Sequence, residues 1–320
     1  MRCPIGSAGV PSNRSVGRRL KLGVLVSHPI QYFVPVYREL AKREDIDLTV
    51  IYRTRVGVDA YYDSGFGKTI SWDLPLLDGY RSEFLSKKTN LRGLEPRVVI
   101  TLLQNRFDVL IVHGYNYATN LLGVAVAKFT GTKVLLRGDT RLQKKHLVAS
   151  WYKRWGKRRL LGLFDGFLAI GRLNGDYYRA YGAKEERITF APFCVDNSAF
   201  SLSVVEASSR CKAIRREYGI PEEAIVVLYA SKLTKRKRAQ DVVAAFAKVA
   251  EECSKAWLVI AGDGEEADKL KELARDSGVK TIRFVGFLNQ SALPGLYAAS
   301  DIFVLPSEEE PWGLIVNEVM

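Results

Sequence analysis

The chain of 320 residues is 47% hydrophobic and 26% charged, the composition of a folded protein with room for two domains. Its net charge is +13, and the excess lies in one half: residues 1–160 hold 28 Lys and Arg against 12 Asp and Glu, whereas residues 161–320 hold 20 against 23. No apolar run is long enough to span a bilayer, and residues 1–20 contain no apolar stretch of the signal-peptide kind. We therefore expect a cytoplasmic protein whose basic half meets a negatively charged partner, such as nucleic acid, an anionic membrane or a phosphorylated substrate.

In the first half of the chain, short apolar runs alternate with helical stretches. The runs predict buried strands at residues 22–26, 48–52, 109–112, 134–136 and 166–170, and a helix at 34–43. Residues 53–96 are irregular, and so long a connection is typical of a functional excursion. Strands that alternate with helices indicate a parallel, doubly wound sheet.

After a linker at residues 192–200 the same alternation starts again. Strands are predicted at 225–229, 257–261, 281–285 and 301–305, with helices at 239–252, 265–277 and 292–299. We therefore expect an α/β protein with a disordered segment (1–20), a first domain (21–195) and a second domain (196–320). Two such domains place a ligand cleft between the carboxyl ends of their strands.

The most informative motif follows the last predicted strand. It contains Pro306-Ser307 and then Glu310-Pro311-Trp312-Gly313-Leu314, with a second carboxylate at Glu318. Pro311 suits the first position of a helix, where its missing N–H costs nothing. The free amides of Trp312, Gly313 and Leu314 would then favour an anion. The alternative is a charged helix start with two solvated glutamates.

This run resembles the signature of family 4 glycosyltransferases, which have the GT-B fold and retain anomeric configuration. The resemblance implies two Rossmann-like parallel-sheet domains facing across a cleft, with contacts from Glu310 to the transferred sugar. It also implies that the amides of Trp312, Gly313 and Leu314 hold sugar and phosphate, and that Glu318 binds the nucleotide ribose. Because the family continues for further strands and helices, we expect the chain to be truncated and its second domain incomplete.

A basic loop after the strand at 225–229 contains two lysines five residues apart, Lys232 and Lys237. In this strand-loop-helix context they can bracket a diphosphate, and the family has cations at the same spacing. Where relatives have glycine, this chain has Ser231 and Arg238. The alternative for such a basic run is a solvated face.

Further donor contacts are implied at two later turns. Gly262-Asp263-Gly264 closes a strand, where relatives border the nucleotide; taken alone it predicts only a tight turn. Phe287 and Leu288 follow the next strand, at the place of main-chain contacts to the base, while Phe284 is expected to pack into the core.

The first domain is expected to supply the acceptor side. A branch of the family that acts in cell-surface polysaccharide synthesis has a run similar to His28-Pro29-Ile30-Gln31-Tyr32-Phe33. Asp63, Phe66, Trp72 and Asp73 also resemble that branch, in a segment suited to acceptor contact. His113 ends a strand and is assigned to the donor sugar with a catalytic role. Arg137 and Asp139 end the next strand and are expected near phosphate or acceptor hydroxyls. Asp196 belongs to a run that resembles the family's interdomain turn and is expected at the hinge.

No metal site or other cofactor is predicted. The cysteines share no close spacing and indicate reduced thiols: Cys3, Cys194, Cys211 and Cys253. The single Asp-x-Asp, at Asp45 and Asp47, lies between a helix and a strand, at the wrong end of the sheet for a site. Without a metal, Lys232 and Lys237 would stabilise the leaving diphosphate.

The expected activity is transfer of a sugar from a nucleotide-diphosphate donor to a glycan or lipid-linked acceptor. One alternative is a nucleotide-sugar epimerase or hydrolase of the same fold, which would lack the pair Glu310 and Glu318 in this context. Another is a nucleic-acid-binding protein, motivated by the basic half. Because the sequence contains no recognised module for nucleic acid, we expect no such partner.

An aromatic and basic stretch stands near the end of the basic half. Leu147, Trp151 and Trp155 recur every fourth residue and would share one helical stripe. Basic residues flank the stripe: Lys144, Lys145, Lys153, Arg154, Lys157, Arg158 and Arg159. Either the stripe packs on the first sheet, or it docks peripherally on the cytoplasmic face of an anionic membrane near a lipid-linked acceptor.

Overall fold

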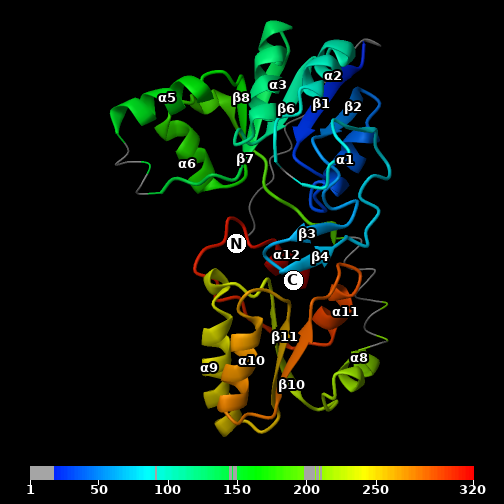
Figure 1. Ribbon diagram of the computed structural model, residues 1–320, viewed down its shortest axis with the longest axis vertical. Coiled ribbons are helices and arrows are strands. Elements are labelled where there is room, and N and C mark those ends of the chain that lie inside the picture. Colours follow the sequence, from blue (N-terminus) through cyan, green and yellow to red (C-terminus); the bar gives the residue numbers. More distant parts are fainter. Residues whose placement is uncertain are drawn as a thin grey trace, which may run out of the picture.

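The structure, a computed structural model, describes residues 18–90, 92–143, 146, 150–197, 206, 209 and 211–320. Two lobes lie one above the other in Figure 1, each built on its own sheet. Apart from residues 18–20, the segment expected to be disordered (1–20) lies outside the described part. The cores of the two lobes are separate clusters of buried side chains, as the two-domain expectation requires.

The first sheet has the strand order β5-β2-β1-β6-β7-β8-β9, and neighbouring strands pair in parallel. Its strands are β1 (Leu20–Val26), β2 (Ile46–Tyr52), β5 (Ser82–Phe84), β6 (Val109–His113), β7 (Lys133–Gly138), β8 (Gly166–Ala169) and β9 (Ile188–Phe190). The strand Leu20–Val26 is buried over its last five residues, the continuous apolar pattern of a strand covered on both faces. The two edge strands, β5 and β9, have three residues each, too few for periodicity to predict them.

Helices cover both faces of this sheet. They are α1 (Val34–Ala41), α2 (Arg97–Asn105), α3 (Ala118–Phe129), α5 (Trp151–Leu161) and α6 (Arg172–Ala180). One core contains Tyr37 of α1, and a second core on the other side contains Val98 of α2, Val124 of α3 and Tyr178 of α6. The predicted doubly wound arrangement is therefore confirmed for the first domain.

The second sheet has the parallel order β12-β11-β10-β13 within the described residues. Its strands are β10 (Ile225–Ala230), β11 (Ala256–Ala261), β12 (Ile282–Gly286) and β13 (Ile302–Phe303). One face packs on α9 (Ala239–Glu252) and α10 (Ala267–Asp276), and the other on α8 (Cys211–Glu217), α11 (Leu293–Ala298) and α12 (Leu314–Val319). Phe284 packs beside the first of these cores, as predicted.

The long excursion between β2 and α2 contains an antiparallel hairpin. Its strands are β3 (Tyr61–Asp63) and β4 (Lys68–Ile70). The hairpin lies between the two lobes, beside α12 (Figure 1). Side chains of the hairpin contact the second domain through Asp63 and Lys68.

One boundary prediction is wrong. The last helix begins at Leu314 and not at Pro311, because Gly313 precedes it in a left-handed conformation with φ of 81°. Such a residue cannot continue a right-handed helix. The amides of Trp312 and Gly313 therefore precede the first turn and do not form part of it.

Candidate functional site

The order of the second sheet identifies where a ligand cleft should lie. The chain leaves β10 to form β11 on one side and returns to form β13 on the other side of β10. In doubly wound sheets, ligands bind outside the carboxyl ends of the strands at such a reversal. The loop with Lys232 and Lys237 follows β10, and the loop with Glu310 follows β13, so the fold brings these predicted residues together.

Lys237 and Glu310 form a direct ion pair between these two loops. Their side chains are only 15% and 22% exposed, so the pair is screened from water more than a surface pair would be. Burial alone would raise the pKa of Glu310, but Lys237 and the charge of Arg236 hold that pKa below its usual value. Glu310 is therefore an anion that already has a cation beside it.

Lys232 is paired with a residue of the first domain. Its ammonium contacts both oxygens of Asp63 at 2.8 Å, across 169 positions of sequence. Burial would raise the pKa of Asp63, yet the bond and charge of Lys232 and the amides of Gly65 and Phe66 lower it. Asp63, expected to face the acceptor, thus lies against the predicted diphosphate loop.

The Gly262-Asp263-Gly264 turn needs its glycines. Gly262 has φ of 136°, and a Cβ there would stand 1.9 Å from the carbonyl oxygen of Ser231. A Cβ on Gly264 would lie 2.6 Å from the carbonyl oxygen of Leu233. The turn is therefore pressed against the loop of Lys232, as a nucleotide-bordering turn would be. Asp263 binds Lys68 of the hairpin at 2.7 Å.

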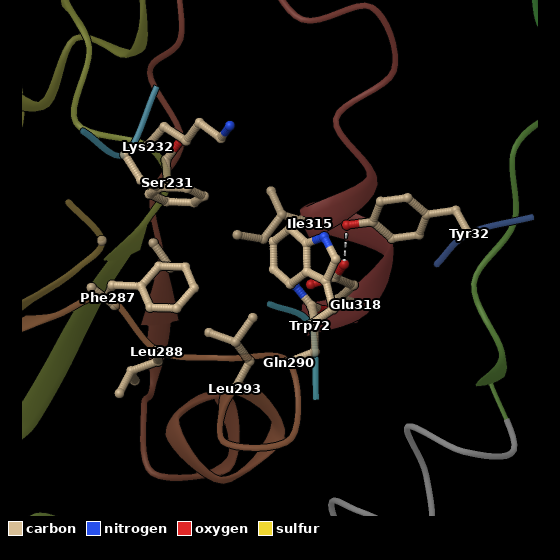
Figure 2. Close-up of a pocket in the computed structure, with 14 residues that line it drawn as sticks. Tyr32, Trp72, Ser231, Lys232, Phe287, Leu288, Gln290, Leu293, Ile315 and Glu318 are labelled. Carbon is tan, nitrogen blue, oxygen red and sulfur yellow. Dashed lines mark hydrogen bonds between the residues drawn. The ribbon is translucent and has the colours of Figure 1, made fainter. Parts of the chain in front are cut away.

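A cavity of about 130 Å³ lies between the two domains at this point. Figure 2 shows Lys232, Phe287 and Leu288 on one side of it and the pair Tyr32–Glu318 on the other, with Trp72 between. The remaining lining residues are Phe66, Ala230, Ser231, Ala261, Gly262, Gln290, Leu293 and Ile315. The predicted donor residues Gly262, Phe287, Leu288 and Glu318 therefore share one cavity.

Glu318 is buried, so the alternative of two solvated glutamates is wrong. One carboxylate oxygen accepts a 2.5 Å hydrogen bond from Tyr32 of the first domain, and the other accepts a 2.8 Å bond from Tyr297. Burial, followed by the charge of Glu318, raises the pKa of both tyrosines. A ribose would therefore have to share or displace these hydroxyl groups.

Trp312 packs across the domain boundary. Its ring lies edge-on to Phe193 at 6.0 Å between centroids, and its indole N–H donates to Asn317 at 3.1 Å. Gly313 and Leu314 complete the helix entry described above. Contacts with Phe193 and Asn317 therefore fix the position of the Trp312 side chain.

Two histidines of the first domain are held neutral. Burial, followed by the charge of Arg137, lowers the pKa of His113 to about 3. Burial and the charge of Arg53 lower the pKa of His28 to about 4. His113 ends β6 and lies against the ring of Phe33 at 4.5 Å. At neutral pH each ring can exchange hydrogen bonds but carries no charge.

The predicted acceptor-side residues are more dispersed. The guanidinium of Arg137 lies 5.4 Å from the ring of Phe33 and 5.2 Å from that of Phe193, and donates to the carbonyl of Pro192 at 3.3 Å. Asp139 is exposed. Gln31 lines a second interdomain cavity of about 390 Å³, together with the predicted hinge residue Asp196.

Some residues of the site were not predicted. Arg141 pairs with Glu309, and Gln143 donates to the same carboxylate at 2.9 Å, so the first domain holds the loop before Glu310. Nothing in the sequence pairs these positions. Tyr32, in contrast, belongs to the run that resembles the polysaccharide branch.

Within the described part of the chain, no cluster of three or more His, Cys, Asp or Glu is arranged to hold a metal ion. Asp45 precedes β2 and is paired with Arg43 at 2.8 Å. It therefore lies at the amino end of the strand, away from the cleft.

The two tryptophans of the aromatic stripe, which lie in the described part of α5, do not pack on the sheet. Trp151 is 79% exposed and Trp155 is 57% exposed, while Leu161 is buried at the helix end. Leu147, Lys144 and Lys145 lie outside the described residues. The interpretation that the stripe packs inward is therefore wrong for both tryptophans. No helix of the described part is long and apolar enough to cross a membrane.

Two facing parallel-sheet domains with a cationic loop at the strand reversal define an α/β protein with an interdomain cleft. Residues 211–320 match the family described as glycosyl transferases group 1. The expected resemblance to group 1 glycosyltransferases is therefore confirmed for the second domain, about a third of the chain; the narrower assignment to family 4 stays a prediction.

Among curated proteins, N-acetyl-alpha-D-glucosaminyl L-malate synthase of Bacillus anthracis is 37% identical over 108 residues, covering 33% of this chain and 28% of the relative. Alpha-monoglucosyldiacylglycerol synthase of Streptococcus pneumoniae is 25% identical over 244 residues, covering 73% of this chain and 54% of the relative. The chain thus spans about a quarter to a half of the length of such relatives.

The fold also matches solved structures. Anabaena HepE, in complex with UDP and glucose, superposes with a TM-score of 0.64 and 16% identity, covering 94% of this chain and 78% of that one. The match extends over both domains, so the GT-B fold expected from the sequence is confirmed.

Proposed function

We propose that the protein transfers a sugar from a nucleotide-diphosphate donor to a glycan or lipid-linked acceptor, with retention of configuration. The observation that carries the proposal is the meeting of Lys232, Lys237 and Glu310 at the strand reversal of a group 1 glycosyltransferase domain. The UDP bound to the structural neighbour HepE supports a nucleotide donor.

The lysines suit the charge that develops as the donor breaks. The bond from the sugar to the diphosphate cleaves, and negative charge grows on the leaving phosphate, where two ammonium groups stabilise it. Because no protein nucleophile stands out in the sequence, we infer front-face transfer, in which the leaving phosphate takes the acceptor proton. Lys232 and Lys237 would perform the role of a metal ion, so we expect metal-independent transfer.

Glu310 and His113 would position the sugar. Glu310 remains ionised beside Lys237 and can accept hydrogen bonds from sugar hydroxyls. His113 is neutral, because burial lowers its pKa to about 3, and so offers one donor and one acceptor without competing for the charge of the phosphate. Gly262 and Phe287 would border the nucleotide.

For the acceptor, we infer a lipid-linked or membrane-associated glycan. The helix α5 exposes Trp151, Tyr152 and Trp155 among five basic residues, a composition suited to an anionic bilayer surface. The Streptococcus relative, named a monoglucosyldiacylglycerol synthase, agrees with an acceptor held at a membrane.

The direct test is a donor panel. Thermal shift with UDP-, GDP- and ADP-sugars should raise the unfolding temperature for one nucleotide, because a ligand bound only by the folded state stabilises it. Labelled sugar should then pass from that donor to membrane extracts. Release or epimerisation of the sugar without any acceptor product would favour the epimerase or hydrolase alternative.

A further inference from the structure

The hairpin β3–β4 places a carboxylate where the donor's phosphate is expected. Asp63 ends β3 and contacts Lys232 through both oxygens, at 2.8 Å each. One of these oxygens also accepts the amides of Gly65 and Phe66, at 2.8 and 3.2 Å. The Asp63 side chain is only 12% exposed. This carboxylate is therefore a largely buried anion, bound by the ammonium of Lys232, by two amides of its own hairpin and by the hydroxyl group of Tyr61 at 3.2 Å. Of these groups, the ammonium belongs to the second domain, where a phosphate oxygen could take the place of the carboxylate.

Aromatic side chains of the same segment fill the neighbouring space. Phe66 lies edge-on to Phe287 at 4.8 Å between ring centroids, and Trp72 lies 6.4 Å from the same ring. The ammonium of Lys232 stands 4.5 Å from the centre of Phe66. The segment thus covers both the cation and the aromatic ring of the predicted donor pocket.

Three further contacts hold the hairpin and the residues that follow it against the second domain. Lys68 binds Asp263 at 2.7 Å. Asp73 accepts from the hydroxyl group of Ser291, and the amide of Asn289 donates to the carbonyl of Ser71 at 2.8 Å. The cavity that remains is about 130 Å³, below the roughly 300–1,000 Å³ of small-molecule sites. Phe66 and Trp72 of this segment line the cavity, so displacement of the segment would enlarge the space beside Lys232.

We propose that Asp63 occupies the diphosphate position on Lys232 in the free protein, and that donor binding exchanges this carboxylate for phosphate and displaces the β3–β4 hairpin. The inference rests on the proposed function, because it takes a nucleotide diphosphate as the incoming anion. Asp63 acts through Lys232 and competes with the donor for its ammonium. The ammonium is paired both before the exchange and after it.

Because the donor binds only when Lys232 is available, the apparent donor affinity equals the intrinsic affinity multiplied by the fraction of molecules in which Asp63 does not occupy Lys232. The coupling is reciprocal: bound diphosphate weakens the contact of the hairpin with Lys232 by the same factor by which that contact weakens diphosphate binding. Neutralising Asp63 should therefore tighten diphosphate binding, whereas a residue that merely orients Lys232 for the donor would have the opposite effect.

The test is calorimetric titration with pyrophosphate, UDP, GDP and ADP. Asp63→Asn keeps the size of the side chain and removes its charge, and we expect about tenfold tighter binding of the diphosphates that bind wild type. Asp59→Asn is the matched control, because Asp59 pairs with Arg55 within the same excursion and does not contact Lys232. Its affinity should equal that of wild type.

A double-variant cycle locates the effect. In Lys232→Met the ammonium is absent, so adding Asp63→Asn should leave the affinity unchanged. Tighter binding of equal size in that background would overturn the exchange, because the gain would then be a general effect of charge. Unchanged or weaker binding in Asp63→Asn alone would also overturn it.

Hydrogen exchange separates this inference from the proposed function. On addition of diphosphate to wild type, amides of residues 61–70 should exchange faster while those of 231–238 become protected. Slower exchange across 61–70 would overturn the displacement. If neither wild type nor Asp63→Asn binds any of the four ligands, the proposed function itself fails, and the inference with it.

Discussion

Two basic regions of this protein differ in whether their cations are paired with carboxylates. In the cleft, each predicted diphosphate lysine has a carboxylate partner, Asp63 for Lys232 and Glu310 for Lys237. On α5, none of the basic residues Lys153, Arg154, Lys157, Arg158 and Arg159 forms an ion pair with another described residue. The five cations of α5 therefore add to the net charge of +13, whereas the two lysines of the cleft are offset by their carboxylate partners.

The difference follows from solvation. A charge removed from water costs several kcal/mol unless it is paired, so a partly buried cleft retains cations only with partners in place. Cations on an exposed helix remain hydrated, need no partner, and attract anionic surfaces over about a Debye length of 10 Å. The cleft is therefore suited to exchange of one anion for another, and α5 to attraction over distance.

The largest expected effect is on the paired cations of the cleft. Lys237→Ala and Glu310→Gln should each lower kcat for sugar transfer by about 10²–10³, because each removes a charged contact to the reacting donor. Steady-state transfer assays with the donor identified by thermal shift give the measurement.

Lys235→Ala is the control for these variants, since Lys235 is an exposed lysine of the same short turn. It should leave kcat unchanged. Near-normal turnover in both Lys237→Ala and Glu310→Gln would contradict the assignment of the site.

Glu318 differs from Asp63 and Glu310, because its carboxylate accepts hydrogen bonds from hydroxyl groups and not from an ammonium group. Glu318→Ala should raise the donor KM and also lower the free energy of unfolding by about 2–3 kcal/mol, because Tyr32 and Tyr297 lose a buried acceptor. Urea unfolding and donor titration measure the two effects separately. A lower stability with an unchanged KM would show that Glu318 only joins the domains.

Burial also suppresses charge that has no partner, as the histidines of the first domain show. His113 has a pKa lowered from 6.5 to about 3 by burial and by Arg137. Between pH 3 and pH 6.5, His113 binds a proton in the unfolded chain but not in the folded protein. The contribution of neutral His113 to the free energy of unfolding is therefore present above pH 6.5 and is lost as the pH falls. Between pH 7 and pH 5 the loss should be about 1–2 kcal/mol.

Replacing the imidazole with a group that does not titrate isolates this contribution. In His113→Gln, the fall in unfolding free energy between pH 7 and pH 5 should be smaller than in wild type by that amount. Denaturant titrations at each pH provide the comparison. Equal pH dependence in both proteins would show that His113 titrates normally in the folded state.

Much of this architecture could be predicted from the sequence, because continuous apolar runs mark strands covered on both faces. The predicted helix at 239–252 coincides with α9, and the strand predicted at 257–261 differs from β11 by one residue. The position of Lys232, Lys237 and Glu310 in the loops after β10 and β13 also followed, since these loops lie at the carboxyl ends of predicted strands.

What the sequence did not show are the partners of these charges. Asp63 and Lys232 are 169 positions apart, and their contact depends on how the two domains face each other. The late start of α12 depends on the left-handed backbone of Gly313, which Pro311 does not signal. The burial of Glu318 depends on Tyr32 from the other domain. Each of these features is set by tertiary contacts.

The smallest expected effect concerns the unpaired cations of α5. Wild type should co-sediment with phosphatidylglycerol vesicles at low salt and less at high salt, because each basic residue near the surface contributes about 1 kcal/mol. Lys153→Gln and Arg154→Gln should therefore each weaken binding about fivefold. Trp151→Ser and Trp155→Ser should reduce the salt-resistant part, since these exposed rings supply the apolar contact.

Lysines that already have partners provide the control. Lys269 and Lys271 of α10 are exposed and lie within 4 Å of the carboxylates of Glu266 and Asp268. Their Gln variants should not change sedimentation, because neither residue lies on the surface formed by α5. Equal binding to neutral phosphatidylcholine vesicles, or no binding at low salt, would contradict electrostatic docking. In that case the exposed aromatic residues of α5 would require a protein partner.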